Sequence, residues 1–209
     1  MKTKLYLIAA LLLCGLLGGC RNPWMEKILE PLFLYKVGDT GPGGGVVFYD
    51  KGNSSGGWRY LEVAPGGWYG IGPDDPLLEW APGTVPGTPG YENVPGATGI
   101  AIGTGRANTR AIIAIVGDAD PATNCPAAWA CVNYRGGGKS DWFLPSLDEL
   151  NELYKQSYVV GGFDLINSYP YWSSSQYSEY AAFCQYFTFG SLDVDGKFND
   201  YPVRPIRAF

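Results

Sequence analysis

The chain has 209 residues, with 15 Lys and Arg against 20 Asp and Glu, so its formal net charge is -5 at pH 7. No basic run is present to follow a phosphate backbone, which argues against nucleic acid as a partner. The chain has no histidine, and this excludes Ser-His and Cys-His nucleophiles. Its 30 Gly, 16 Pro and 15% aromatic residues favour a loop-rich fold held by large rings over a helical bundle.

The first twenty residues are typical of an export signal. Lys2 and Lys4 precede an apolar run, 5–17, that is too short to cross a bilayer as a stable helix. Two glycines then precede Cys20. This order of features indicates a leader that is cut just before the cysteine. An ordinary cleaved signal and an uncleaved anchor remain the alternatives.

The segment around Cys20 resembles a bacterial lipobox. The resemblance implies that residues 1–19 are a lipoprotein signal peptide and that Cys20 carries lipid, with a second acyl chain making the anchor stable. Residues 20–34 are then a lipid-anchored tether for a domain over 35–209. We therefore expect a protein of the cell envelope, on the outer membrane or cell surface, whose partners include the membrane.

In chain order, the first predicted elements of the domain are two strands. Val46–Tyr49 is a compact β-prone run, and Trp58–Val63 alternates after a turn over 50–57. Residues 65–99 form a long stretch punctuated by Gly and Pro. A loop of this length is either functional or packed on its own aromatic residues, and we favour packing.

Two helices and a β-rich end follow. The first helix is predicted over 108–116. The second opens at Ser146, because Ser146 and Glu149 form a capping box ahead of an amphipathic pattern. Residues 171–209 predict a hairpin or meander whose terminal strand, 201–208, is at an edge or interrupted, since it contains two prolines.

Three cysteines remain in the domain. Cys125 and Cys131 are six residues apart, and an oxidising compartment predicts a disulfide between them. Cys184 is left over. A zinc site needs more ligands than these.

Five ordered blocks of sequence carry a resemblance to a known family. They are Val37–Tyr49 (VGDTGPGGGVVFY), Ile102–Gly105 (IGTG), Asp141–Leu150 (DWFLPSLDEL), Tyr171–Ser175 (YWSSS) and Val203–Phe209 (VRPIRAF). In this order they resemble the Lcl C-terminal domain family, over about 35–209. That family is similar to the formylglycine-generating-enzyme type of C-type lectin fold. The resemblance implies an α+β, C-type-lectin-like fold with a small twisted antiparallel sheet, two helices, long irregular loops and adjacent chain ends.

The same resemblance extends to the variable proteins of diversity-generating retroelements. In those proteins a fixed frame brackets positions that are rewritten by mutagenic reverse transcription. The frame here is Trp172–Ser175, Gln185, Phe187, Gly190, Lys197 and Val203–Phe209. The candidate variable positions between the frame residues, from Tyr180 to Pro202, contain none of the five residue types, Gln, Glu, Lys, Met and Trp, that adenine substitution in such codons does not produce. Glu179 lies outside this set. Whether the gene for this chain is diversified in this way stays open.

The segment inside the frame supplies the predicted ligand residues. Their mixture of rings, carboxylates and amides is typical of adaptable recognition surfaces. The alternative is that about half of the rings are core residues of strands. The predicted ligand residues are Tyr180, Phe183, Tyr186, Thr188, Phe189, Leu192, Asp193, Val194, Asp195, Phe198, Asn199, Asp200 and Tyr201.

An enzyme is the competing class. Formylglycine-generating enzymes use cysteines to bind copper, and Cys184 has no second cysteine near it in the sequence. We expect no catalytic residue, no metal and no cofactor. Residues 193–196 (DVDG) do not have calcium-loop spacing and predict a hairpin turn. An arginine, Arg204 or Arg207, is expected to pair with Asp141 or Glu149 and to hold the terminal strand.

These observations predict a surface lipoprotein, not an enzyme, whose C-terminal loops bind an external protein or glycan. The alternatives are an envelope structural component without a soluble ligand and a residual enzyme of the formylglycine-generating type. The oligomeric state is left open.

Overall fold

The structure, a computed structural model, describes residues 34–209 except 71, 73, 89–90, 118–119 and 164. The predictions for the signal peptide, Cys20 and the tether lie outside these residues, apart from Leu34. Tyr35–Phe209 forms one compact unit of mixed α and β structure. Among the helices in the described part, none has the length and apolar character to span a bilayer.

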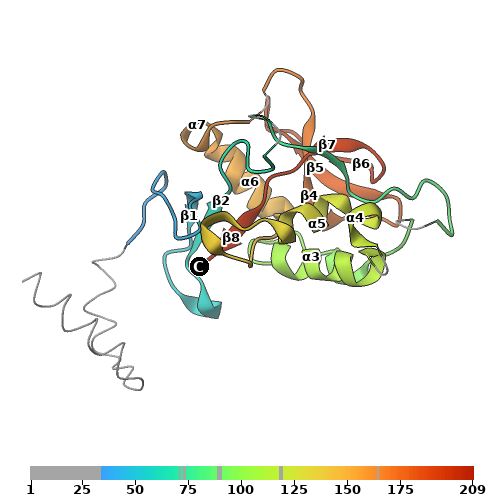
Figure 1. Ribbon diagram of the computed structural model, residues 1–209, viewed down its shortest axis with the longest axis horizontal. Helices are drawn as coiled ribbons and strands as arrows, with labels where there is room; N and C mark the ends of the chain where they lie inside the picture. The colour runs from blue at the N-terminus through green and yellow to red at the C-terminus, as the bar shows by residue number, and fades with distance from the viewer. Residues whose placement is uncertain (1–33, 71, 73, 89–90, 118–119, 164) are drawn as a thin grey trace, which may run out of the picture. The chain divides into compact units, whose positions relative to one another are not determined.

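The first sheet joins the two ends of the domain. Its strand order is β1 (Val46–Asp50), β2 (Tyr60–Val63) and β8 (Ile206–Ala208), all antiparallel. The two predicted N-terminal strands are therefore confirmed, with β2 beginning two residues later than expected. Figure 1 shows the C-terminus lying beside β1 and β2.

Two further antiparallel sheets follow. One pairs β3 (Leu77–Glu79) with β7 (Asp200–Pro202). The other has the order β4 (Pro170–Gln176), β5 (Ala181–Tyr186) and β6 (Leu192–Gly196). The predicted C-terminal meander is thus present, although the sheet structure is divided among three small sheets.

The terminal strand is interrupted at its prolines, Pro202 and Pro205, as predicted. The terminal segment is interrupted between β7 and β8, at residues 203–205. The hairpin turn predicted for residues 193–196 was wrong in position, because these residues lie inside β6. The turn follows at Lys197, where the Asn199 amide donates to the Gly196 carbonyl at 3.0 Å.

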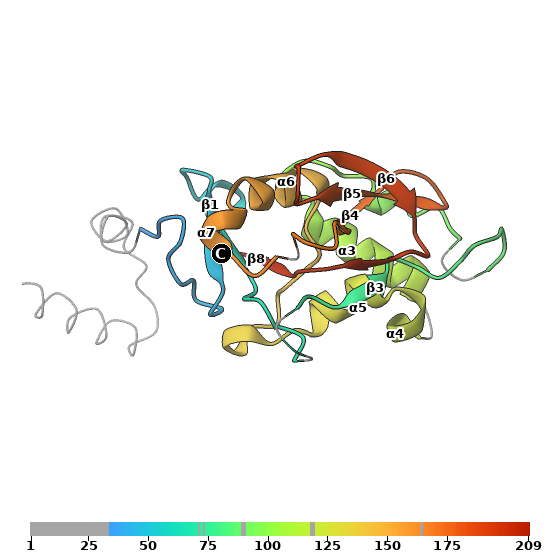
Figure 2. The same ribbon diagram turned by 90° about the horizontal axis from the view of Figure 1, so that it is seen from above.

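The helices are more numerous than the two that were predicted. Those two correspond to α3 (Gly105–Ile112), which continues as the π-helical η4 (Ile113–Gly117), and to α6 (Leu147–Lys155). Short helices add α4 (Pro121–Asn124), α5 (Pro126–Asn133) and α7 (Ser157–Val160). Three single 3-10 turns are η2 (Ser55–Gly57), η3 (Pro95–Ala97) and η5 (Gly136–Gly138). In Figure 2, α4 and α5 lie on the opposite side of the domain from β6.

The capping box of α6 is confirmed. The Ser146 hydroxyl accepts from the Glu149 amide, and the Glu149 carboxylate accepts from the Ser146 amide at 2.7 Å. Glu149 is buried and also accepts from the Gly103 amide at 2.9 Å. Burial raises the pKa of Glu149 while these amides oppose the shift. One carboxylate therefore starts α6 and fixes the loop before α3.

The interior contains two apolar clusters. One is built around Trp80, Ile112, Leu144 and Trp172, and the other around Phe48, Leu61, Leu150, Tyr171 and Phe187. Trp80 is 1% exposed, and Trp68 and Leu78 pack against the same cluster. The long stretch before η3 therefore packs on its own aromatic residues, as predicted.

The predicted disulfide between Cys125 and Cys131 is absent from the structure, which has both thiols free and buried. Cys125 is the N-cap of α5 and Cys131 lies within that helix. Six helical residues advance by about 9 Å, whereas a disulfide needs Cα atoms within about 7 Å. The helical conformation therefore separates the two cysteines.

The two C-terminal arginines take different partners. Arg207 pairs with Asp141, as predicted, and its Nη1 also lies 2.8 Å from Glu62 Oε1. Glu149, the alternative partner, serves the capping box instead. Arg204 pairs with Asp75, which the sequence did not indicate.

Candidate ligand-binding face

The predicted ligand residues lie at the surface of the C-terminal sheets, and each of them is at least partly accessible. The exposed ones are Tyr180, Thr188, Phe189, Leu192, Asp193, Phe198 and Asp200. The half-buried ones are Phe183, Tyr186, Val194, Asp195, Asn199 and Tyr201. Phe189 reaches 67% exposure, although large apolar side chains are usually covered.

Most frame residues show the opposite behaviour. The buried ones are Trp172, Ser173, Ser174, Ser175, Gln185, Phe187, Lys197, Val203, Arg204, Pro205 and Ile206, and the half-buried ones are Gly190, Arg207, Ala208 and Phe209. Of the positions between frame residues, Gln176, Ala181, Ala182, Cys184 and Pro202 are buried as well. The segment therefore separates into an interior set that holds the fold and an outer set that is free to contact a ligand.

Strand alternation divides the outer set between the two faces of the β5–β6 hairpin. The register pairs Cys184 with Asp193 and Phe183 with Val194. Directly paired residues share a face, and neighbours along a strand point to opposite faces. The predicted residues thus do not form the single patch that the sequence suggested.

One face carries a cluster of acidic and aromatic groups, which we call the acidic-aromatic cluster: Tyr186, Asp193, Asp195, Asn199 and Tyr201. Asp195 accepts a hydrogen bond from Asn199 Nδ2 at 2.9 Å and another from the Tyr201 hydroxyl. The Tyr201 ring lies 4.8 Å from the ring of buried Trp172. Because Asp195 is held by two donors, the cluster has a fixed arrangement.

The carboxylates of this cluster affect the neighbouring hydroxyls. Burial raises the pKa of Tyr201, and the hydrogen bond and charge of Asp195 raise it further. The pKa of Tyr186 is raised by burial first and then by Asp193. Both phenols therefore stay protonated at neutral pH and can donate hydrogen bonds.

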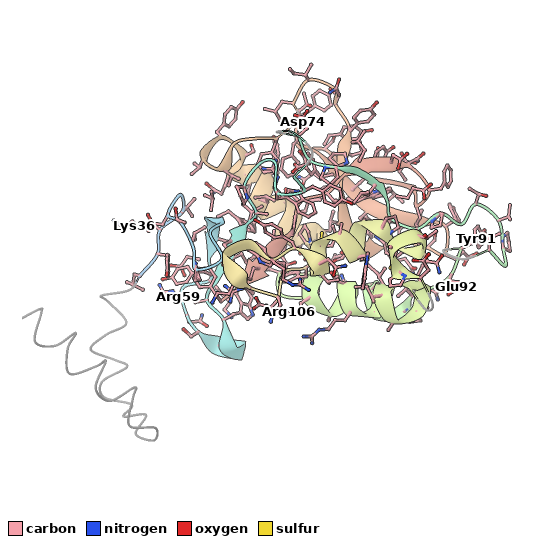
Figure 3. The ribbon with its side chains drawn as sticks, in the orientation of Figure 1. Lys36, Arg59, Asp74, Tyr91, Glu92 and Arg106 are labelled. Carbon is pink, nitrogen blue, oxygen red and sulfur yellow. The ribbon has the colours of Figure 1, made fainter. Side chains whose placement is uncertain are left out.

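The other face and the adjoining turns carry mainly rings. Phe183 meets Tyr177 edge to face at 5.4 Å, and Tyr180 stacks on Tyr91 at 6.4 Å. Figure 3 shows Tyr91 on a loop at the edge of the domain. These contacts connect the β4–β5 turn to the loop before η3.

Lys197 fixes the loops beneath this surface. Its Nζ donates to Gln176 Oε1 at 2.8 Å and to the carbonyls of Glu92 at 2.9 Å and Glu179 at 2.8 Å. The ammonium also lies 4.5 Å from the centre of the Trp80 ring. Burial lowers the pKa of Lys197 to about 8. This buried lysine joins three loops, which limits the freedom they would lose on binding.

Sequence reasoning missed two hollows in the described part of the domain, and the first of them lies beside α5, away from β6. A groove of about 460 Å³ lies between α5 and Trp68, with Tyr69, Trp129 and Tyr134 among its lining residues. It contains none of the predicted ligand residues. The spacing of its rings along the chain gave no periodic signal that could have grouped them.

The second hollow, of about 350 Å³, borders the β5–β6 turn. Thr188 lines it together with Tyr154, Tyr158 and Leu165. Tyr158 is 94% exposed. Of the predicted ligand residues, Thr188 is the one that meets this hollow.

Within the described part of the chain, no group of three or more Cys, Asp or Glu side chains is arranged to hold a metal ion. Cys184 is buried, and burial together with Asp193 and Asp195 raises its pKa to about 12.

The chain matches no protein-family model and no curated protein.

Proposed function

We propose that this chain is a lipid-anchored protein of the bacterial cell envelope with a C-type-lectin-like domain, and that its C-terminal segment binds an external ligand. One observation carries the proposal: the predicted ligand residues are accessible, while the frame residues Gln185, Phe187 and Lys197 between them are buried. The accessible set includes large rings, of which Phe189 is 67% exposed. The resemblance of its sequence blocks to the Lcl C-terminal domain family supports the same function.

The chemistry of the surface favours a protein ligand. Exposed rings such as Phe189 and Phe198 supply contact area at a small cost in side-chain entropy. Asp193 and Asp200 add negative charge, which complements basic or hydrogen-bond-donating groups and repels anionic glycans. A protein with a basic or amide-rich surface is therefore the ligand class that we propose.

Diversification by a retroelement is part of the same hypothesis. Substitution at exposed positions usually changes stability by less than about 0.5 kcal/mol, whereas substitution of Trp172 or Phe187 would disrupt the core. The burial pattern supports a segment that tolerates such change. Sequencing the neighbouring DNA tests this: the hypothesis requires a near-identical template repeat and a reverse transcriptase gene.

The buried Cys184 supports a binding protein over an oxidase of similar fold. The thiol is 0% exposed and belongs to no group of three or more metal-ligating side chains among the described residues. The proposal accordingly assigns no catalytic residue.

The binding experiment uses the purified full chain on an array of extracellular proteins and glycans. A face variant combines Phe189→Ala, Phe198→Ala and Asp193→Asn, and a control variant carries Ile115→Ala, an exposed apolar residue of η4 outside this surface. We expect the face variant to lose at least about tenfold in affinity and the control to keep wild-type affinity. Both should retain the wild-type Tm within a few degrees.

Unchanged binding by the face variant would contradict the proposal, as would a collapse of its Tm. The anchor is tested separately by labelling cells with an alkyne-tagged fatty acid. Label should enter the wild-type chain and be absent from a Cys20→Ser variant.

A further inference from the structure

A third pocket, of about 250 Å³, lies on a different part of the domain. It is lined by residues of α3, of the segment before α6, and Val132. The polar lining residues are Arg106, Thr109, Arg110, Ser140 and Asp141. None of the predicted ligand residues lines it. Figure 3 shows Arg106 at the lower edge of the domain, next to α3.

Two arginines concentrate positive charge at this pocket. Arg106 and Arg110 are four residues apart on α3, so their side chains share one helix face, where like charges repel. Arg110 is exposed, and its guanidinium forms no hydrogen bond or ion pair with any residue that the structure describes. In a chain of net charge -5, two neighbouring arginines of which Arg106 alone has an acidic partner, Asp141, are a local exception.

Arg106 is held in place but is only partly satisfied. Its guanidinium lies 5.2 Å from the centre of the Phe143 ring, and Nη2 donates to the Ala208 carbonyl at 3.3 Å. Nη2 is 3.6 Å from Asp141 Oδ2, which is beyond hydrogen-bond distance. The other oxygen of Asp141 accepts from Arg207. One carboxylate is therefore shared between two guanidinium groups.

The Nε donor of Arg106 is buried and has no hydrogen-bond partner within the described part of the domain. Burial lowers the pKa of Arg106, and the charges of Arg110 and Arg207 lower it further while Asp141 opposes them. A buried donor without an acceptor costs free energy, which leaves this guanidinium incompletely satisfied. Because Nε itself is out of contact with solvent, an anion would meet the accessible part of the Arg106 side chain, which is 36% exposed.

We propose that this pocket binds the oxyanion of a phosphate or sulfate ester. The guanidinium groups of Arg106 and Arg110 and the hydroxyl of Ser140 all line the pocket, and all three are hydrogen-bond donors. Arginine is suited to this role because its planar fork donates in pairs to oxyanions. The volume is below the range of about 300–1,000 Å³ that is usual for complete small-molecule ligands, so the pocket holds the anionic group of a ligand.

The test is calorimetric titration of the full chain, in a non-ionic detergent, with inorganic phosphate and with sulfate. Sodium chloride of equal ionic strength is the reference. We expect saturable binding of both oxyanions, weakened by about tenfold or more in Arg110→Gln and by a smaller factor in Ser140→Ala. Arg135→Gln is the matched control, since among the described residues its guanidinium bonds to the Val132 and Tyr134 carbonyls and it does not line the pocket. Its affinity should equal that of the wild type.

Binding no stronger than that of chloride would overturn the proposal, as would equal affinity in the wild type and Arg110→Gln. Arg110 is exposed, so the Arg110→Gln variant should keep the fold. It therefore tests the proposal even if replacement of the partly buried Arg106 by Gln unfolds the domain. The ligand recognition proposed for the C-terminal face is measured separately and does not depend on this result.

A phosphoryl group could belong to a soluble ester or to a lipid headgroup. Co-sedimentation of the Cys20→Ser chain with phosphatidic acid vesicles, with and without competing inorganic phosphate, separates these sources. Sedimentation that phosphate abolishes indicates the headgroup, and binding of phosphate without sedimentation indicates the soluble ester. Either outcome supports the oxyanion site.

Discussion

Arg204 and Asp75, which are 129 residues apart in the sequence, form an ion pair that is almost completely buried. The Arg204 Nη2 lies 2.6 Å from Asp75 Oδ2, and the two side chains are 0% and 1% exposed. Asp75 also accepts from the Tyr171 hydroxyl at 2.7 Å and from Trp68 Nε1 at 3.0 Å. The Arg204 Nη1 donates to the Gly161 carbonyl at 2.9 Å, and Nη2 also donates to the Gly162 carbonyl. This pair connects four distant segments.

We predict that Asp75→Asn lowers the free energy of unfolding by about 3–5 kcal/mol, because it leaves the Arg204 charge buried without a counter-ion. Urea denaturation measures the change. The matched control is Asp50→Asn, which breaks the accessible pair between Asp50 and Arg59 at 2.8 Å. That change should cost no more than about 1 kcal/mol. Equal costs for the two variants would refute the assigned role of the buried pair.

The separation of buried and exposed positions predicts two different responses to alanine. Trp172→Ala should destabilise the domain by about 3–5 kcal/mol, since the indole is 0% exposed and packs in the core. Phe189→Ala should change stability by less than about 0.5 kcal/mol. Thermal unfolding of both variants checks this, and a large loss for Phe189→Ala would show that its ring supports the fold.

We predict that Lys197 gives the free energy of unfolding an unusual pH dependence. Its pKa is about 8 in the folded chain against 10.5 for the free side chain, so between these values the unfolded chain binds more protons. The contribution of Lys197 to stability therefore rises as the pH increases from about 8 to 10.5, by up to roughly 3 kcal/mol. Below pH 8 the lysine is charged in both states, and this rise is absent.

The measurement compares the wild type with Lys197→Met by urea denaturation across this pH range. Tyrosine ionisation occurs in both proteins and cancels in the difference. The difference in free energy should move in favour of the wild type as the pH rises. A constant difference would show that the folded state does not perturb Lys197.

We predict that Cys125 and Cys131 react slowly with thiol reagents in the native protein. Burial raises the pKa of Cys125 to about 12 and that of Cys131 well above its usual value. Native protein should therefore resist iodoacetamide, and protein unfolded in urea without reductant should be alkylated at both positions. Peptide mass spectrometry distinguishes this from a disulfide, which would leave both peptides linked and unmodified.

The elements that the sequence predicted correctly have local signals. The strand at 46–49 is a run of β-prone residues between turns, and Ser146 with Glu149 specifies a helix start within four residues. Such patterns require no knowledge of distant segments. The interruption near the C-terminus followed from Pro202 and Pro205 in the same way.

The missed features depend on distant partners or lack a pattern. The helix α5 has little amphipathic character, because its small residues contact the core on several sides. In addition, Cys125 and Cys131 suggested a disulfide-closed loop at this place. The division of the ligand face depends on the register that opposes Cys184 to Asp193. The pocket that we propose to bind an oxyanion forms because the fold brings Ser140 next to α3. None of these relationships is encoded in neighbouring residues.

The position of β2 between β1 and β8 has a consequence for biogenesis. Tyr60 and Phe209 exchange backbone hydrogen bonds of 2.9 and 3.0 Å, so the last residue completes a sheet that begins near the start of the domain. During translation, the second edge of β2 is covered only after β8, the last strand of the domain, has been made. A chain that ends before β8 keeps that edge open and invites association with other chains. This sheet consequently closes late, after nearly all of the domain over 35–209 has been synthesised.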